Sequence, residues 1–478
     1  MSVVDDPARR SPSRARATVP AARRPAGLFR AFWRWHFYAA AVVIPVLLVL
    51  AVTGLVYMFR FQIEPLVHHD LMRVDHEPGQ VIQKYEAQRQ AVAQAHPDAT
   101  VVSMTEPAEA DHSTRFTIQT ADEQTRDVFV DPYDATVLGS LNPDTTISGT
   151  AVRIHADLMA GRVGDTIMEL GACWAIVMAL TGYYLFFRGR RARKRQRSAG
   201  APGAALRSNH ARVGAVVGIG LLLLVVSGLP WTGIWGAQAQ KLATAGGTSF
   251  WSQDHGALSD PTSTLDESLP HSHHVIPWAQ EKTGVPQSGA PGTEVSVANL
   301  DTAVAVADRE GLTHPLTVAL PADDQGVFSA IGYAFNDPAK ERTVHVDQYG
   351  GQAVSSYGYA NYPALAKVVS QGIALHEGRR FGTLNMWLTT AFCLAVVASC
   401  VTGPLMWWRR RPRGNGQLGA PRGGSALRTS PLLAAGILAL AVFLPVFGAS
   451  LLVVLLLDRF VLRRLPRTRR FFGTAPAG

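Results

Sequence analysis

Four histidines, with residues that follow them at repeated distances, are the part of this 478-residue sequence best suited to chemistry. His36 precedes Gly54 by 18 residues, and His210 precedes Gly228 by the same 18. At about 3.6 residues per turn this is about five whole turns, so each histidine shares a helix face with its glycine. Imidazole is a common metal ligand, and two imidazoles on facing helices can bind one metal between them. The matched spacing therefore favours a ligand site.

A second pair, His155 and His376, precedes apolar segments that run in the opposite direction. Each is followed by a glycine 6 residues later and by another 27 residues later. Twenty-seven residues is about seven and a half turns, so the same-face argument fails for the later glycines if the helix is continuous. The earlier glycines are candidates for a break. These glycines are Gly161 and Gly182 after His155, and Gly382 and Gly403 after His376.

Long apolar segments separate these histidines and must position them. Hydrophobic residues make up 47% of the sequence and charged residues only 17%. Several apolar runs reach the roughly 20 residues that a helix needs to cross a bilayer. We therefore expect an α-helical integral membrane bundle in a lipid bilayer, with helices over about 32–59, 165–187, 211–235 and 380–408.

The positive charges identify one side of this bundle. The formal net charge is +9, and arginines gather in the N-terminal tail and in segments 188–210 and 409–430. This is the positive-inside pattern of cytoplasmic loops, so we expect a multi-pass protein of the cytoplasmic membrane with its N-terminus in the cytoplasm. Nucleic acid is not an expected partner, because the charge follows the ends of apolar runs. On this topology His36 and His210 lie near the cytoplasmic side, and the other pair lies near the outer side.

Two polar stretches, 61–150 and 237–370, are predicted to lie outside the cytoplasm. In the first, residues 78–97 have helical spacing and precede segments that alternate as strands. The second repeats this order, with a helix in VSVANLDTAVAVADREG. Each stretch is expected to form a small α+β domain. The three cysteines lie in apolar runs and indicate no disulfide framework.

The last apolar segment, 431–457, is long enough to cross once, but the arginine-rich tail after it would then lie outside. Pro445 and Gly448 fall within the segment, where a helix kinks or turns back. We favour a hydrophobic hairpin that keeps the tail inside, with a transmembrane helix as the alternative.

The expected organisation follows from these elements. The membrane and loop segments are 30–60 (helix 1), 151–188 (outer histidine segment and helix 2), 189–209 (basic loop), 210–236 (helix 3), 371–408 (outer histidine segment and helix 4), 409–430 (loop) and 431–460 (hairpin or helix). The two extracytoplasmic domains are 61–150 and 237–370, and the basic tails are 1–29, expected to be disordered, and 461–478.

Two motifs resemble those of a known family. VFVDPYDATVLG (128–139) and VHVDQYGGQAVSSY (344–357) are similar to the PepSY domain, in which two strands around an Asp-containing turn close a small α+β unit. The flanking WHFYAAAVVIPVLLVLAVTGLVYMFR and LHEGRRFGTLNMWLTTAFCLAVVASCVTGPLMWW resemble the PepSY-associated transmembrane proteins, also called iron-regulated membrane proteins. The likeness covers about residues 30–410 and implies a duplicated helix–PepSY–helix unit. Asp134-Ala135-Thr136 departs from it, because a Thr-Gly turn is usual there.

The resemblance also implies a cofactor and an activity. The family includes ferrisiderophore reductases that carry b-type haems between their helices. Carried over by position, it implies that His36 and His210 ligate one haem b, and that His155 and His376 ligate a second. Electrons would then pass from a cytoplasmic or quinone donor to ferric iron or a ferric siderophore outside. The sequence has no nucleotide-binding fingerprint of its own.

Other interpretations stay open. A single histidine at a membrane interface often only caps a helix or contacts headgroups. His271, His273 and His274 lie in a predicted loop and are weak candidates for a metal site. The alternative functions are a non-enzymatic PepSY protein for binding, assembly or regulation, and a metal-uptake accessory.

Overall fold

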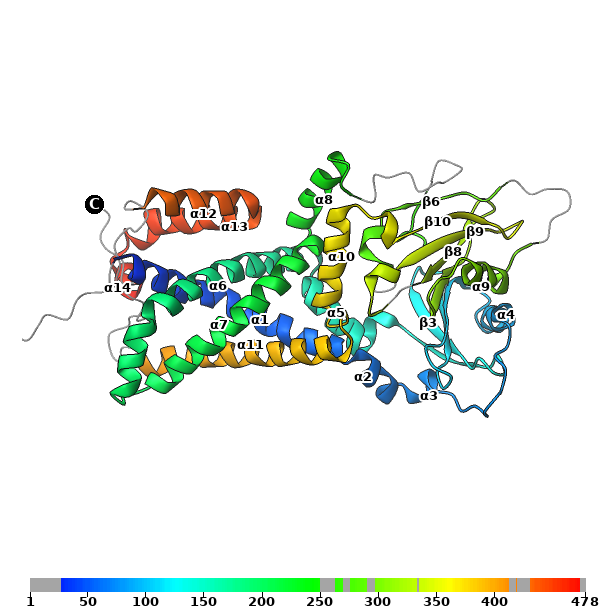
Figure 1. Cartoon of the computed structure of the whole chain (residues 1–478), viewed down its shortest axis with the longest axis horizontal. Helices are drawn as coiled ribbons and strands as arrows, with labels where there is room; N and C mark the ends of the chain where they lie inside the picture. Colours follow the sequence, from blue (N-terminus) through cyan, green and yellow to red (C-terminus); the bar gives the residue numbers. More distant parts are fainter. Residues whose placement is uncertain are drawn as a thin grey trace, which may run out of the picture.

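The computed structural model describes residues 27–249, 263–269, 276–289, 297–332, 335–411, 418 and 430–472. It consists of a long helical bundle and a sheet domain, with short helices between them (Figure 1). Among the described residues, five helices are long and apolar enough to cross a membrane. Four of them form the bundle: α1 (Gly27–Met58), α6 (Gly161–Ser198), α7 (Ala204–Gly228) and α11 (Thr383–Arg410).

The four bundle helices are arranged in a ring. Helix α6 packs between α1 and α7, and α11 contacts the same two helices, so α1 and α7 lie diagonally across the bundle. Val43, Cys173, Leu221 and Val396 are among the side chains that form its buried core. Apolar side chains also cover the outside of the bundle, where a water-soluble helix would carry polar ones. The bundle is therefore built for a lipid bilayer, as the composition predicts.

Two short helices, α5 (Ile147–Asp157) and α10 (Ala364–His376), pack at one end of the bundle. Helix α5 contacts α1 and α6, whereas α10 contacts α7. The chain breaks between each short helix and the long helix after it, near Gly161 (φ +54°) and Gly382 (φ +58°). Only glycine adopts this left-handed conformation without strain. The helices that follow His155 and His376 are therefore not continuous with the segments that carry these histidines.

We call the end of the bundle next to α5 and α10 the sheet end. The opposite end, where α1 begins and α6 connects to α7, is the terminal end. Helix α6 extends about ten residues past the predicted boundary at 187, to Ser198. Arginine and lysine are good helix formers, so the basic run continues the helix beyond the apolar part.

All strands of the two polar stretches except β5 (Ser263–Thr264) and β6 (Gly284–Val285) join one antiparallel sheet. Its order is β10-β9-β8-β7-β1-β2-β3-β4. The first half is β1 (Thr100–Thr105), β2 (Thr114–Gln119), β3 (Thr125–Val130) and β4 (Val137–Leu141). The second is β7 (Leu316–Ala319), β8 (Val327–Gly332), β9 (Arg342–Asp347) and β10 (Ala353–Gly358).

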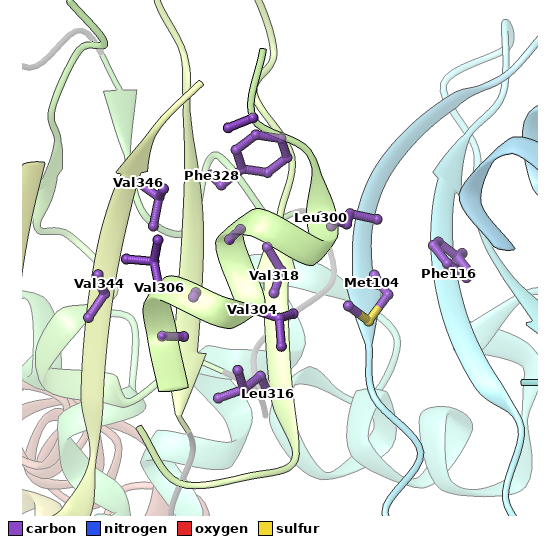
Figure 2. Packing of buried hydrophobic residues seen from close by; sticks show 14 of the residues in the cluster. Met104, Phe116, Leu300, Val304, Val306, Leu316, Val318, Phe328, Val344 and Val346 are labelled. Atoms are coloured by element: carbon purple, nitrogen blue, oxygen red, sulfur yellow. The ribbon is translucent and has the colours of Figure 1, made fainter. Parts of the chain in front are cut away.

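This continuous sheet corrects the expectation of two separate small domains. Strand β1 pairs with β7, and Met104 lies opposite Val318. Pairing satisfies the backbone groups that each half alone would expose at its edge. One buried core spans the joint, with helices α4 (Tyr85–Ala95) and α9 (Leu300–Arg309) packed on the sheet. Figure 2 shows Leu300 and Val304 of α9 facing the strands, with Met104 and Phe116 continuing the core into the first half.

Helix α4 begins at Tyr85, seven residues later than the predicted start at residue 78. The backbone N–H of Gln83 donates to the carbonyl of Pro132 at 2.7 Å, which ties the preceding segment to the turn after β3. Helices α2 (Arg60–Val67) and α3 (His69–Met72) connect α1 to this domain, and α8 (Trp235–Ala245) projects from the sheet end (Figure 1).

The C-terminal apolar segment forms two helices, α12 (Pro431–Phe443) and α13 (Pro445–Leu457), that lie side by side (Figure 1). The chain turns at Leu444, immediately before Pro445. Each helix of 13 residues is about 20 Å long, shorter than the roughly 30 Å hydrocarbon core. The segment Pro445–Leu462 is nevertheless the fifth candidate span by length and composition. Helix α14 (Pro466–Phe472) returns to the terminal end, where Tyr38 donates a hydrogen bond to the carbonyl of Phe472 at 3.2 Å.

Candidate functional site

At the terminal end, two of the four predicted histidines bind the neighbouring helix. His36 Nδ1 lies 3.0 Å from the carbonyl oxygen of Met178 and 3.2 Å from Thr181 Oγ1, both on α6. His210 Nδ1 lies 3.1 Å from Thr402 Oγ1 on α11. Each ring is therefore oriented by a partner on another helix of the bundle.

At the sheet end, the other two histidines make the same kind of contact. His155 Nδ1 on α5 lies 2.9 Å from Thr53 Oγ1 on α1. His376 Nδ1 on α10 lies 3.1 Å from Ser227 Oγ and 2.9 Å from the carbonyl oxygen of Leu224, both on α7. All four histidines thus use Nδ1 to bind a threonine or serine.

These partners determine which ring nitrogen carries the proton. A carbonyl oxygen can only accept, so Nδ1 of His36 and of His376 must donate. The hydroxyl of Thr53 donates to the carbonyl of Val49 at 2.7 Å, and that of Thr402 donates to Ala398 at 2.8 Å. Because each hydroxyl hydrogen is already used, these two hydroxyls accept from their histidines. In all four rings Nε2 is therefore the nitrogen with a free lone pair, as a metal ligand requires.

We call the threonine or serine that binds each histidine Nδ1 its bracing residue. A glycine follows each bracing residue in the chain and lies against the same histidine ring. A Cβ on Gly182 would come within 3.2 Å of His36 Cε1, and a Cβ on Gly228 within 3.2 Å of His376 Cε1. A Cβ added to Gly54 would lie 3.8 Å from His155 Cε1, and a Cβ added to Gly403 would lie 3.9 Å from His210 Cε1. Each Thr/Ser-Gly pair therefore binds an imidazole with its hydroxyl and makes room for it with its glycine.

This arrangement corrects the interpretation of the repeated spacings. Gly54 lies against His155 at the sheet end and not against His36, although both Gly54 and His36 belong to α1. Each 18-residue or 27-residue interval therefore joins a histidine at one end of the bundle to the Thr/Ser-Gly pair that contacts a histidine at the other end. Along α1 the two sites are separated by about 26 Å, at about 1.5 Å for each residue from His36 to Thr53.

The two histidines at the sheet end lie close together. The ring centroids of His155 and His376 are 6.3 Å apart, and the ring planes cross at 86°. Two imidazoles on opposite sides of one metal place their centroids about 6 to 6.5 Å apart, given a metal–nitrogen bond of about 2.0 Å on each side. One ring comes from each half of the chain.

The terminal-end pair is also drawn from both halves, since His36 belongs to α1 and His210 to the diagonally opposite α7. All four histidines are partly exposed.

A family comparison agrees with this architecture. Residues 33–410 match the PepSY-associated TM region. The chain belongs to this family. The match begins just before His36 and ends at the last residue of α11, so the PepSY-associated region contains all four histidines and their bracing pairs. No curated protein matches the chain.

The weaker metal candidates do not add a site. His271, His273 and His274 lie outside the described residues. Within the described residues, one other group of metal-ligand type, made of Glu109, Asp111 and His112, lies in the sheet domain. Asp111 forms an ion pair with Arg73 there.

Two further features escaped prediction from the sequence. The four bracing hydroxyls were visible only as residues that precede glycines. A group of buried carboxylates beside His376, lining a small cavity, had no sequence signal because its members are scattered between residues 281 and 377. Glu169 of α6 is buried and accepts hydrogen bonds from the backbone N–H groups of Ile234 and Trp235 at 3.0 and 3.1 Å, at the start of α8.

Proposed function

We propose that this PepSY-associated protein binds two b-type haems and passes electrons through the membrane. One haem would be held by His36 and His210 at the terminal end, and the other by His155 and His376 at the sheet end. The observation that carries this proposal is the fourfold repetition of one arrangement, in which Nδ1 donates to an oxygen atom of a neighbouring helix and Nε2 remains free.

The residues present fit haem better than other metals. Each site offers two neutral imidazoles and lies in an apolar bundle, which suits bis-histidine ligation of a macrocycle. Zinc sites use three or four protein ligands, and calcium or magnesium sites use oxygen ligands. The glycines against the rings remove side chains where a macrocycle or a closely packed helix needs room.

Bound haem would supply one-electron redox chemistry at each site. The chain's own residues contribute orientation, because the bracing hydroxyls fix each ring and its tautomer. They also exclude water between the sites, where Val43, Leu47 and Leu221 are buried in the core. Two sites at opposite ends of the bundle fit a route that crosses the membrane.

We further propose that the sheet end lies outside the cytoplasmic membrane and that the acceptor there is ferric iron or a ferric siderophore. The basic segments at the terminal end support this orientation through the positive-inside rule. The donor would be a quinol or a separate cytoplasmic reductase.

The proposal is tested in sealed vesicles that contain the purified protein in one orientation. A reductant is enclosed with the terminal end, and a ferric chelate is added at the sheet end with a chromogenic ligand for ferrous iron. Ferrous iron should form in wild-type vesicles and should fall to the rate of empty vesicles in a His36→Ala, His155→Ala variant. Equal rates in wild-type and empty vesicles would contradict transmembrane electron transfer.

A further inference from the structure

A small cavity lies beside the sheet-end histidines, where α10 meets the sheet domain. Its volume is about 20 Å³, which is room for about one water molecule and excludes an iron chelate. Its polar lining consists of three carboxylates, a guanidinium and a hydroxyl: Glu281, Glu341, Glu377, Arg379 and Ser370. Water-sized cavities lined by acidic groups are suited to holding and transferring protons.

Arg379 forms its closest ion pair with one of these carboxylates, Glu377. Its guanidinium donates to Glu377 and, at 2.7 Å, to the carbonyl oxygen of Phe335. Its closest approach to Glu341 is 4.0 Å, which is too long for a hydrogen bond. Glu341 accepts a hydrogen bond of 3.2 Å from Ser370, and its side chain is only 2% exposed. Glu341 is therefore a buried carboxyl whose ion pair with Arg379 is long, at 4.0 Å, because Arg379 lies closer to Glu377.

The groups around Glu341 come from every element packed against it. Arg379 opposes protonation, whereas Glu377 and Asp337 favour it through their negative charges. Tyr362 and Glu281 lie nearby on the sheet-domain side. Burial raises the pKa of Glu341 to about 8, against the opposing effect of Arg379 and Ser370.

The cavity is directly connected to the sheet-end histidine pair. Trp231 lines the cavity, and its ring centroid is 6.0 Å from that of His376. Glu377 follows His376 in the chain and accepts a hydrogen bond from Tyr57 of α1 at 3.3 Å. A change of charge at the histidine pair would therefore act on this cavity across the Trp231 ring and the adjacent Glu377, because charges interact strongly between partly buried groups.

We propose that Glu341 is a proton acceptor coupled to the electron at the sheet-end pair, an inference that rests on the proposed haem function. With haem bound, the Glu341 carboxylate would take one proton from solvent when the sheet-end site gains one electron, and the carboxylic acid would release that proton when the site loses the electron to the acceptor. The added electron is a negative charge in a low-dielectric site, and protonation of Glu341 compensates it.

Potentiometric titration tests this coupling in a His36→Ala, His210→Ala variant, which retains only the sheet-end haem. Above about pH 8, where the Glu341 carboxyl ionises in the oxidised state, its midpoint potential should fall with a slope that approaches about 59 mV per pH unit for one proton per electron. Glu341→Gln should remove this slope. Glu281→Gln, in the same cavity, and Glu106→Gln, at the joint between the two half-sheets, should both keep it. A slope that persists in Glu341→Gln, or that disappears in Glu281→Gln instead, overturns the assignment.

A second readout does not need haem. Because burial also raises the pKa of Glu281 to about 8, infrared titration is done in a His155→Ala, His376→Ala, Glu281→Gln variant. It should show a protonated carboxyl band that disappears near pH 8 and is absent when Glu341→Gln is added. Absence of the band overturns the proposal even if wild-type protein binds haem. A wild-type protein that shows the band but binds no haem overturns the proposed function, and with it the coupling.

Discussion

Each of the four histidines depends on a hydroxyl from another helix, and this dependence can be measured one residue at a time. Thr53→Val removes the acceptor of His155 Nδ1 but keeps the branched shape of the side chain. We expect haem affinity at the sheet end to fall by about 10- to 100-fold, because the hydrogen bond to the Thr53 hydroxyl fixes the orientation and tautomer of the ligating histidine. Haem content and redox titration of the purified variant measure the effect.

Thr390→Val is the matched control for that substitution. Thr390 is also a buried threonine of the bundle, but its hydroxyl donates to Met386 of its own helix. It should leave both haems in place. Equal haem loss in the two variants would show that Thr53 acts only through the stability of the bundle.

The glycines give a second residue-scale test on a single helix. In α7, a Cβ on Gly228 would lie 3.2 Å from His376, whereas a Cβ on Gly214 would meet nothing within 4 Å. Gly228→Val should therefore displace His376 and remove the sheet-end haem, and Gly214→Val should keep both haems at a similar expression level. If both variants behave alike in haem content, Gly228 has no special role beside the ring.

At the scale of elements, the joint between the two half-sheets contains a charged cluster. His314 Nδ1 lies 2.6 Å from Glu106, which follows β1, and His314 Nε2 lies 2.6 Å from Asp308 of α9. Both ring nitrogens face carboxylates, so both must donate, as only the protonated ring can. Burial lowers the pKa of His314, but hydrogen bonds and charges from Glu106 and Asp308 raise it further, and the net shift is upward.

This upward shift predicts the pH dependence of the sheet domain. A histidine with a raised folded-state pKa contributes stability that is present below the unfolded value of about 6.5 and is lost as pH rises through the folded value. The melting temperature of wild type should therefore fall more steeply than that of His314→Gln between about pH 6 and about pH 9. The His314 side chain is 47% exposed, so the contribution is at most about 1 kcal/mol. Parallel curves for the two proteins would contradict a stabilising imidazolium at this joint.

The elements also show what the sequence determines and what it does not. Apolar runs predict the bundle helices because a bilayer requires about 20 apolar residues in succession. Gly161 and Gly382 were identified as candidate breaks, and both lie where a short helix gives way to a long one. The pairing of Met104 with Val318 had no local signal, because strand alternation shows which face is buried but not which distant edge will be its neighbour.

The site was predicted to the same partial extent. Spacing identified His36 and Gly54 as members of one pattern, since both lie on α1 at a helical interval. It could not reveal that Gly54 lies against His155, because the period of a helix defines its faces and not the helix opposite. The roles of Thr53 and Ser227 depend on those facing contacts and therefore required the structure.

At the scale of the whole molecule, two histidine pairs lie at opposite ends of one apolar bundle, and each pair takes one histidine from each half of the chain. The sheet end carries the large soluble domain and the acidic cavity beside His376 (Figure 1). The terminal end carries the basic helix extension and both described ends of the chain. This polarity is what a carrier of electrons between two compartments requires.

Haem stoichiometry in paired histidine variants tests the proposed di-haem site most directly. Reduced-minus-oxidised spectra and haem content per chain would be measured for wild type and for two double variants. One double variant combines His36→Ala with His210→Ala, and the other combines His155→Ala with His376→Ala. His314→Ala is a control away from the bundle. Wild type and the control should bind two b-type haems, and each double variant should bind one, with different midpoint potentials. Haem-free wild-type protein, or two haems retained in either double variant, would contradict the assignment of the four histidines as ligands.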